Sequence, residues 1–309
     1  MSEPAIPKVG WRGELVPSIK KFLDAHPRLQ LGGVEGYTFE RRHHTQVFGI
    51  HSLPDDRIHP IKEVEYTAIC GPHGTIPIRV LYPSSGQEKR LQGKAGALIY
   101  FHGGGYTVGS VDEFENGLRL VAEESGCQVY AVEYRRAPEF QFPTQLDEYS
   151  AVIDWLQGKE GKRRGVDPNR VCGGGDSAGG NMTAGVTLRR LDEGKKPLAA
   201  QMLLYPEARL PFDTPAATEN NSGYYLECNG IFSFADHYLP RGTPPAHRYV
   251  SPGMQPARDL KGQPPTTVFT SGFDPLRDVG VEYAHKLSEA GVDVHWHHYK
   301  NLTHGCGMV

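Results

Sequence analysis

The feature that most constrains the fold of this chain is the glycine-rich run at residues 171–180, Val-Cys-Gly-Gly-Gly-Asp-Ser-Ala-Gly-Gly. It contains the pattern G-x-S-x-G at residues 175–179, with Ser177 at its centre. Such a serine occupies a strained turn between a strand and a helix, and glycine flanks it because larger residues would collide with neighbouring backbone. The run therefore predicts a strand, a sharp turn and a helix, with the Ser177 hydroxyl lifted clear of a sheet.

The residues around this run fit that prediction. Residues 170–172 are predicted to end a short buried strand that follows a turn at 167–169. Residues 178–192 are predicted to form a helix because apolar side chains recur at helical spacing, and Gly194 then ends it. The N-terminus of that helix would direct its partial positive charge toward a carbonyl group beside Ser177. An ordinary glycine-rich turn is the alternative that this segment alone leaves open.

Strand and helix patterns alternate along most of the remaining chain. An antiparallel hairpin is predicted first, between residues 64 and 82, because two alternating apolar stretches flank a Gly-Pro-His-Gly turn. The later patterns predict strands at 97–101, 128–134, 200–205, 266–270 and 292–299, and helices at 112–125, 144–157 and 277–290. This order predicts an α/β fold whose mostly parallel sheet is covered by helices on both faces.

Two segments do not follow this alternation. Residues 1–57 combine one short helical pattern with many Pro, Gly and His residues, and residues 207–265 contain one predicted helix, at 230–238. A long connection without regular structure usually forms a lid or a binding element. We therefore expect 1–57 and 207–265 to form a cap over a catalytic part made of residues 58–206 and 266–309. An irregular surface excursion is the alternative for the second segment.

Composition and charge argue against several other classes of protein. The net charge is −3 and no basic stripe is present, so a nucleic-acid partner is not expected. No apolar run reaches the length of a membrane span, and the N-terminus lacks the apolar core of a secretory signal. The five cysteines are scattered without C-x-x-C spacing, which favours a reducing, cytoplasmic location over disulfides or zinc. His295 and His297 share a strand face, but no third metal ligand accompanies them, so no metal site is expected.

A second glycine-rich segment, residues 102–105 (His-Gly-Gly-Gly), follows directly on the predicted strand at 97–101. Three consecutive glycines allow backbone N–H groups to turn inward without obstruction by side chains. Lipases and esterases use such a loop for the oxyanion hole, together with the residue after the nucleophile. The expected donors are therefore Gly103, Gly104 and Ala178. A phosphate-binding loop is not indicated, because no Gly-Lys-Ser or Gly-Lys-Thr follows.

An acyl-transfer serine needs a base, and the base needs an acid that orients it. His304 is the expected base, since it follows the last predicted strand, whereas three other late histidines lie within that strand. Asp274 is the expected acid because it comes soon after the strand at 266–270, at the edge of a parallel sheet where such sites are built. Asp278 is the competing acid, but it falls inside the following helix, a position that favours a structural ion pair.

Five segments together resemble the hormone-sensitive-lipase-like family of α/β-hydrolases, which includes bacterial and fungal carboxylesterases and arylacetamide deacetylase. The segments are residues 102–105, 134–143 (Tyr-Arg-Arg-Ala-Pro-Glu-Phe-Gln-Phe-Pro), 174–181 (Gly-Gly-Asp-Ser-Ala-Gly-Gly-Asn), 274–278 (Asp-Pro-Leu-Arg-Asp) and 304–305 (His-Gly). The resemblance extends over residues 62–309 and implies the α/β-hydrolase fold with a helical cap. The site residues that it implies are Ser177 as nucleophile, His304 as base, Asp274 as orienting acid, and Gly103, Gly104 and Ala178 as oxyanion donors.

The chain departs from the pattern of that family at three places. Cys306 stands where the family usually has an aromatic residue after His-Gly. The sequence stops at Val309, where the family continues with a closing helix, so an element that covers the core is expected to be missing. Residues 1–57 match the family only loosely, so the resemblance does not define the acyl pocket.

From these residues we expect a serine carboxylesterase that hydrolyses short- to medium-chain or aryl carboxylic esters through an acyl-enzyme. An amidase, deacetylase or lactonase acting on a secondary metabolite is the first alternative, and a non-catalytic ligand-binding receptor on the same scaffold is a remote one. The chemistry requires no cofactor, its partner is a small-molecule ester, and a homodimer is one assembly that we consider. The cap aromatics expected to line the substrate site are Trp11, Phe22, Tyr224, Tyr225, Phe232 and Phe234.

Overall fold

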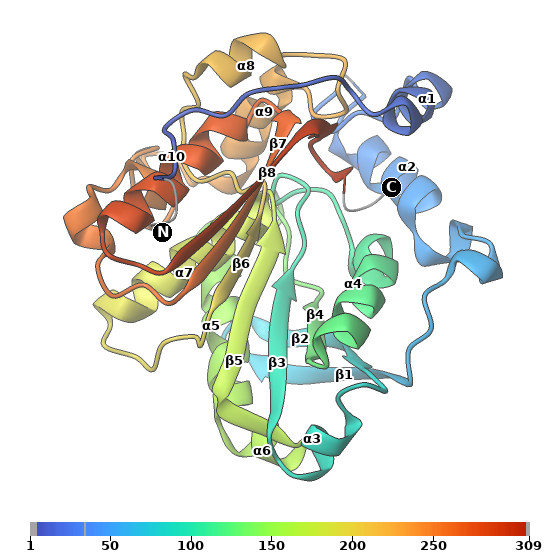
Figure 1. Cartoon of the computed structure of the whole chain (residues 1–309), viewed down its shortest axis with the longest axis vertical. Coiled ribbons are helices and arrows are strands. Elements are labelled where there is room, and N and C mark those ends of the chain that lie inside the picture. The colour runs from blue at the N-terminus through green and yellow to red at the C-terminus, as the bar shows by residue number, and fades with distance from the viewer. Residues whose placement is uncertain (1–4, 34, 307–309) are drawn as a thin grey trace.

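The computed structural model of the chain describes residues 5–33 and 35–306, which build one sheet with helices around it (Figure 1). The strands are β1 (Glu63–Gly71), β2 (Gly74–Tyr82), β3 (Ala95–Phe101), β4 (Gln128–Val132), β5 (Val166–Asp176), β6 (Gln201–Leu204), β7 (Thr266–Phe273) and β8 (Val294–Thr303). Their order in the eight-stranded sheet is β1-β2-β4-β3-β5-β6-β7-β8. β1 pairs antiparallel with β2, and β2 with β4, whereas every other pair is parallel. The prediction of a mostly parallel sheet that begins with an antiparallel hairpin is confirmed.

The two faces of the sheet are buried under different helices because side chains alternate along each strand. The main helices are α4 (Val111–Ser125), α5 (Thr144–Gln157), α7 (Ala178–Asp192) and α10 (Arg277–Glu289). On β3, Leu98 and Tyr100 pack with α4, whereas Ile99 and Phe101 pack on the other face with α5 and α7. Helix α10 lies beside α7 in a further apolar cluster with β6 and β7. The predicted helices on both faces are therefore confirmed.

Two strand boundaries near the sites of interest differ from the prediction. β5 does not end near residue 172 but continues through Gly173, Gly174 and Gly175, which pair with β3 on one side and β6 on the other. Its first residues, predicted as a turn, already belong to the strand, since Val166 is paired with β3. The longer β5 brings its end to the residue before Ser177.

The two segments predicted to form a cap contain more helix than the sequence pattern indicated. Their helices are α1 (Pro17–Ala25), α2 (Tyr37–Phe48), α8 (Pro215–Glu219) and α9 (Cys228–Tyr238), with 3-10 turns at Ile50–Ser52, Asp55–Arg57, Pro252–Met254 and Ala257–Leu260. Two short helices outside the cap were also not predicted, α3 (Gln87–Leu91) and α6 (Lys159–Arg163). Within the described residues, no helix combines the length and the apolar character that a membrane span requires.

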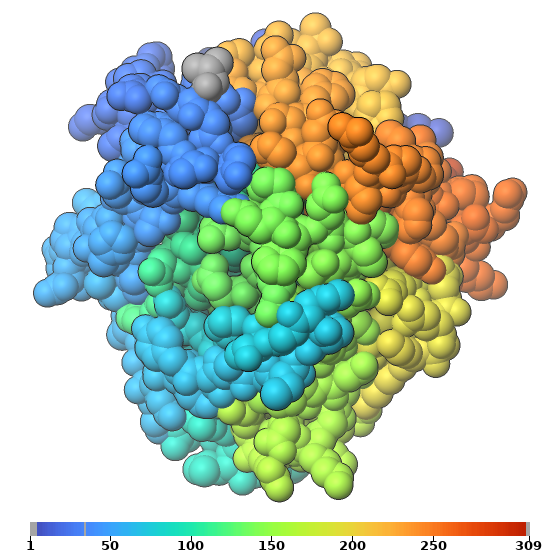
Figure 2. Space-filling view, turned by 180° about the vertical axis from the view of Figure 1, so that it is seen from behind, coloured from blue at the N-terminus to red at the C-terminus, as the bar shows by residue number. Residues whose placement is uncertain are grey.

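The helical parts of these two segments meet over the carboxyl ends of the parallel strands (Figure 1). A parallel bridge joins Leu31 to Leu226, because the amide of Leu31 donates to the Tyr225 carbonyl and the amide of Glu227 donates to the Leu31 carbonyl, each at 2.9 Å. Figure 2 shows the blue N-terminal surface next to the orange surface of the second segment, above the green centre of the chain. The cap helices therefore lie directly over the edge of the sheet from which Ser177 emerges.

The first described residues do not lie among the cap helices but along β8 and α10 (Figure 1). The Gly10 amide donates to the Asp278 carboxylate at 3.0 Å, and the Gly13 amide donates to the Lys300 carbonyl at 2.8 Å. The Trp11 ring lies edge-on to the Trp296 ring at 6.0 Å. This strap, residues 5–16, fastens the N-terminal end of the chain to the last strand of the sheet.

Candidate active site

Ser177 occupies the turn between β5 and α7 and has φ 52° and ψ −119°, a conformation that costs backbone strain. Its amide donates to the Leu204 carbonyl at 2.8 Å, which fixes the turn to β6. Glycine is required on both sides, because a Cβ at Gly175 or at Gly179 would overlap the carbonyl oxygen of Phe101 on the neighbouring strand. The predicted strand, turn and helix around Ser177 are present.

His304 and Asp274 lie beside Ser177 at the ends of β8 and β7. The His304 Nε2 atom is 2.9 Å from the Ser177 Oγ, and its Nδ1 is 2.9 Å from the Asp274 Oδ2. Ser177 is 5 % exposed, His304 is 2 % exposed and Asp274 is 0 % exposed, so all three side chains are shielded from bulk water. Since a carboxylate only accepts, Nδ1 carries the hydrogen and Nε2 is free to accept the hydroxyl proton of the serine.

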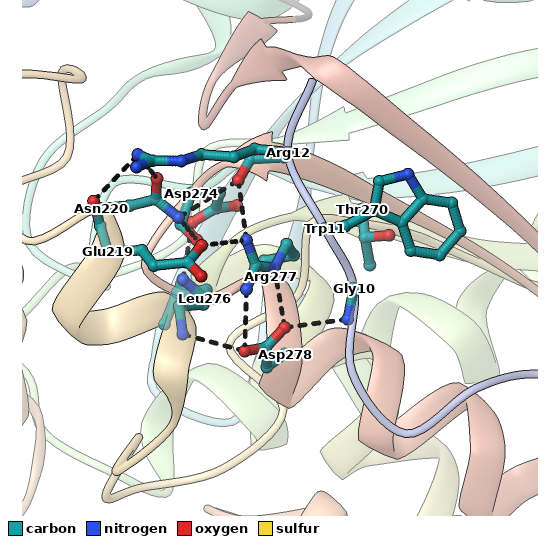
Figure 3. Close-up of polar contacts among 12 residues, drawn as sticks. Gly10, Trp11, Arg12, Glu219, Asn220, Thr270, Asp274, Leu276, Arg277 and Asp278 are labelled. Atoms are coloured by element: carbon teal, nitrogen blue, oxygen red, sulfur yellow. Dashed lines mark hydrogen bonds and ion pairs between the residues drawn. The ribbon is translucent and has the colours of Figure 1, made fainter. Parts of the chain in front are cut away.

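The loop that carries Asp274 is held by groups that the sequence did not identify (Figure 3). The Leu276 amide donates to the Asp274 Oδ1 at 2.8 Å, so the second carboxylate oxygen is also engaged. The buried Asn220 side chain donates to the carbonyls of Gly272 at 3.2 Å and Asp274 at 3.1 Å. These bonds fix the direction in which the carboxylate meets His304.

Asp278 has a different set of partners (Figure 3). Its carboxylate accepts from Arg277 Nε at 2.7 Å, from the Gly10 amide at 3.0 Å and from the Ala216 amide at 2.9 Å. Arg277 is 1 % exposed and also pairs with Glu219 at 2.7 Å. The predicted role of Asp278 in a structural ion pair is confirmed, and this pair connects the strap, α8 and α10.

The glycine loop, residues 102–105, differs from the expectation at its first glycine. The Gly103 amide does not face Ser177 but donates to the Asp176 Oδ1 at 2.8 Å. The same oxygen accepts from the Tyr100 hydroxyl at 2.7 Å. Burial raises the pKa of Asp176 to about 6, and these two hydrogen bonds oppose part of that rise. Asp176, which directly precedes Ser177, thus anchors the glycine loop.

The next two glycines have backbone conformations that open their amides. Gly104 has φ 103° and Gly105 has φ 57°, values that favour glycine. A Cβ at Gly105 would also overlap the Phe234 ring of α9. Among residues 5–33 and 35–306, no acceptor pairs with the amides of Gly104, Gly105 or Ala178. Ala178 is the first residue of α7, where the helix leaves its amides unpaired and a partial positive charge collects.

A small cavity of about 10 Å³ adjoins Ser177 and His304. Its walls come from the glycine loop, from α4 and from the cap, and they include Leu31, His44, Val108, Glu113, Phe114 and Tyr225. A second cavity of about 10 Å³ lies on another side of His304 and is lined by Phe22, Phe48 and Tyr225. Of the predicted substrate-binding aromatics, the structure therefore places Tyr225 and Phe22 against these cavities, and Phe234 against the glycine loop.

The other three predicted aromatics lie elsewhere. Trp11 is 51 % exposed and belongs to the strap beside Trp296, not to the cap. Phe232 is 52 % exposed, because it points away from the buried face of α9 and meets Phe212 at 5.2 Å. Tyr224 packs on Phe273 at 5.2 Å and lines neither cavity, although its neighbour in sequence lines both.

Two polar residues of the cavity were not found by the sequence argument. Glu113 accepts from the hydroxyls of Thr45 at 2.8 Å and Ser110 at 3.0 Å, and burial raises its pKa to about 7. His44 is 2 % exposed, and burial lowers its pKa to about 4. Neither stands in a motif, and only the folded arrangement of α2 against α4 brings them beside Ser177.

The structure also bears on metal binding and on the cysteines. Within the described residues, no group of three or more His, Cys, Asp or Glu side chains is placed to hold a metal ion. All five cysteines are free thiols. Cys306 lies 3.8 Å from the Ser271 hydroxyl, and burial raises the pKa of its thiol to about 11.

The sheet, the strained serine turn and the Ser-His-Asp arrangement define the class of α/β-hydrolases. A family model described as alpha/beta hydrolase fold matches residues 98–308. The chain belongs to this family, and its predicted resemblance to hormone-sensitive-lipase-like enzymes is confirmed.

Individual relatives cover nearly the whole chain. It is 33 % identical to the esterase LipI of Mycobacterium tuberculosis (strain ATCC 25618 / H37Rv), over 94 % of this chain and 87 % of that protein. It is 30 % identical to the carboxylesterase NlhH of Mycobacterium tuberculosis (strain CDC 1551 / Oshkosh), over 99 % and 91 %. A hyperthermophilic esterase from the archaeon Pyrobaculum calidifontis matches in structure with a TM-score of 0.86 and 30 % identity, over 95 % of this chain and 91 % of that one. The prediction of a carboxylic-ester hydrolase is confirmed.

Proposed function

We propose that the chain hydrolyses small carboxylic esters through an acyl-enzyme on Ser177, with His304 as base and Asp274 as orienting acid. The observation that carries this proposal is the buried relay in which His304 is 2.9 Å from both the Ser177 Oγ and the Asp274 Oδ2. A non-catalytic binding protein on this scaffold would have no need of that geometry.

The relay accounts for each proton of the reaction. His304 Nε2 takes the hydroxyl proton as the Ser177 Oγ attacks the ester carbonyl carbon. The imidazolium then gives this proton to the oxygen of the leaving alcohol, and the C–O bond of the ester breaks. In the second half, a water molecule loses its proton to the same nitrogen and attacks the carbonyl carbon of the acyl-enzyme. The imidazolium then returns this proton to the Ser177 Oγ as the bond between that oxygen and the acyl carbon breaks, which releases the acid and restores the serine. Asp274 keeps the hydrogen on Nδ1 and offsets the positive charge that forms on the ring.

The oxyanion donors of this proposal are Gly104, Gly105 and Ala178. They replace the predicted set because the Gly103 amide already donates to Asp176. Each of the three amides lacks an acceptor among the described residues, and Ala178 adds the positive end of α7. Preorganised donors of this kind stabilise the oxyanion more in the transition state than in the bound ester.

The free space beside the catalytic residues is small. Each of the two cavities beside His304 has a volume of about 10 Å³, roughly one water molecule, so an acyl or aryl group enters only if the aromatic walls move, and a longer chain needs a larger movement. Tyr225, which lines both, and Phe22 stand at the positions where an acyl chain would have to pass. We therefore propose short-chain and aryl esters as the preferred substrates, over the medium-chain esters that the sequence also allowed.

The test is turnover of a panel of p-nitrophenyl esters, from acetate to decanoate, with matched anilides. Ser177→Ala should lower turnover on the order of a million-fold, with the fold unchanged by circular dichroism. Ser222→Ala, on the surface, is the matched control and should keep full activity. An organophosphate should label Ser177 alone. Turnover by a clean Ser177→Ala preparation at the wild-type rate would refute the proposal.

Two further parts of the sequence interpretation stay predictions. A cytoplasmic location is supported by five free thiols, since a reducing compartment preserves them. A homodimer is to be tested by light scattering of the purified chain across protein concentrations.

A further inference from the structure

His44 is a cap residue that reaches the catalytic cavity. It lies on α2, is 2 % exposed and lines the same cavity of about 10 Å³ as Ser177 and His304. The Phe48 ring, with its centre at 5.9 Å, and the Tyr225 ring, at 5.7 Å, pack against the imidazole. These two aromatic rings fix the plane of the imidazole and exclude bulk water from its faces.

One ring nitrogen of His44 is committed to its own helix. Nδ1 lies 2.8 Å from the carbonyl oxygen of Glu40, one helical turn earlier. Because a carbonyl only accepts, Nδ1 must carry the hydrogen. Burial lowers the pKa of His44 to about 4, so the ring is neutral at pH 7 and Nε2 has no hydrogen. Nε2 is therefore a hydrogen-bond acceptor on the edge of the ring opposite that helical carbonyl.

This acceptor has no donor within the described part of the chain. Buried polar atoms are nearly always paired, because leaving one unpaired destabilises the folded protein. The other polar side chains that line the cavity do not pair with this nitrogen within the described residues; they are Glu113, Asp176, Ser177, His304 and Tyr225. Glu113 accepts from the hydroxyls of Thr45 and Ser110 through its Oε1 atom. The molecule that completes the pair must therefore come from outside the chain.

The cavity limits what that molecule can present. Its volume suits a single oxygen or nitrogen atom with its hydrogens. The nearby carboxyl groups of Asp176 and Glu113 are buried and have raised pKa values, which shows that this environment disfavours charge. A neutral hydroxyl group satisfies both limits.

We infer that His44 selects esters that carry a hydroxyl group near the reacting carbonyl, because its Nε2 accepts the hydrogen of that hydroxyl. The inference rests on the proposed esterase function and names the substrate class that the same site prefers. A site built to pair with a hydroxyl discriminates against the analogue that lacks it, since the buried acceptor is then left unpaired.

Matched ester pairs test this inference. Methyl butyrate is compared with methyl 2-hydroxybutyrate and methyl 3-hydroxybutyrate, and ethyl butyrate with 2-hydroxyethyl butyrate, by acid release at pH 7. The first pairs place the hydroxyl in the acyl part and the second in the alcohol part. In at least one pair, His44→Leu should reduce the ratio of kcat/KM for the hydroxylated over the plain ester on the order of tenfold. Comparing ratios between variants cancels the intrinsic reactivity of the two esters.

Two further variants separate pairing from packing. His44→Gln keeps an acceptor at similar reach and should retain part of the wild-type ratio. His43→Leu, at the adjacent position on α2 and outside the cavity wall, should retain all of it. Thermal unfolding of each variant shows whether the cap is intact. Equal ratios in wild type and His44→Leu for every pair would overturn the inference and indicate that only an ordered water pairs with Nε2.

A binding measurement keeps this result separate from the proposed function. The Ser177→Ala protein, labelled with ¹⁵N-histidine, is titrated with methyl 3-hydroxybutyrate, 2-hydroxyethyl butyrate and methyl butyrate. The Nε2 resonance of His44 should move with at least one hydroxylated ester and not with the plain one. If the wild type hydrolyses plain esters but the His44 resonance does not move with either hydroxylated ester, the His44 inference fails while the proposed function stands. If no ester is hydrolysed, the proposed function fails, and the resonance still decides whether His44 binds a hydroxyl.

Discussion

Replacing Asp176 with asparagine removes a buried charge from the site without removing the acceptor that anchors the glycine loop. The Gly103 amide and the Tyr100 hydroxyl both donate to Oδ1, which asparagine retains as its amide oxygen. Only Oδ2 changes, from a carboxylate oxygen to an NH₂ group. Asp176→Asn therefore isolates the free energy of the charge from that of the two hydrogen bonds.

The magnitude follows from the pKa. Burial raises the pKa of Asp176 from 3.8 to about 6, a difference that corresponds to about 3 kcal/mol at 1.36 kcal/mol for each pH unit. Because the folded pKa is the higher one, the folded state binds the proton more tightly. The stability from this group is complete below about pH 4 and is lost as the pH rises through about 6. About half of the change, on the order of 1 kcal/mol, falls between pH 5 and 8.

The assay is urea unfolding of wild type and Asp176→Asn at several pH values from 5 to 8. The stability of the variant relative to wild type should rise by an amount on the order of 1 kcal/mol over this range, and other titrating groups cancel in the difference. His304, which faces Asp176, is the nearby group whose charge opposes the shift, so His304→Gln in both backgrounds checks its contribution. Asp293→Asn, at an exposed position, is the matched control and should give a flat difference.

A difference that falls with pH would refute this reasoning, because it would mean that the folded protein stabilises the Asp176 carboxylate. Activity provides a second check. Asp176→Ala removes the acceptor itself, so the Gly103 amide loses its anchor and turnover should fall by about 10²–10³, the typical loss when an oxyanion donor is displaced. Asp176→Asn should lose far less.

The remaining predictions concern other parts of the site. Asp274→Asn should lower kcat by about 10⁴, whereas Asp278→Asn should act mainly by lowering the stability of the fold. Steady-state kinetics together with thermal unfolding separates the two effects. A stable Asp278→Asn protein with the larger loss of kcat would contradict the assignment of Asp274 as the orienting acid. Phe234→Ala removes the ring that closes over the glycine loop, so preference should shift toward longer acyl esters, and an unchanged profile from acetate to decanoate would argue for packing alone. Cys306 should resist iodoacetamide at pH 7, because its thiol has a pKa of about 11; rapid inactivation that Cys306→Ser escapes would place the thiol in the catalytic path.

The parts of the fold that were predictable from sequence are those set by local patterns. Helices α5 and α7 occupy the predicted residues, since each has apolar side chains at helical spacing and a clear end. Ser177 was identifiable because the glycines at 175 and 179 stand at fixed spacing around it, although the carbonyl oxygen that a Cβ there would meet belongs to Phe101 on the neighbouring strand. The expected positions of Asp274 and His304 followed from their places after predicted strands.

The errors arose where distant segments decide the outcome. The glycine loop supplies several amides, and only its anchor on Asp176 shows that Gly103 turns away. Trp11 was expected in the cap because it lies in the N-terminal segment that was assigned to the cap. Its actual contact, the ring of Trp296, is distant in sequence and leaves no local pattern. His44 carried no signal, because its environment is created by contacts of α2 with α4 and the second cap segment.

The contacts of the strap and of the site join residues that are far apart in sequence, so they can form only late in synthesis. The Gly10 amide pairs with a carboxylate 268 residues later, and the Ser177 and His304 side chains are 127 residues apart. Because the ribosome makes the chain from its N-terminus, the strap cannot form its contacts until α10 and β8 have been made. The sheet from β1 to β6 can begin to form before that point, but it holds a serine without its base. On the proposed mechanism, hydrolysis needs both Ser177 and His304, so it requires that the last strand has been made and folded.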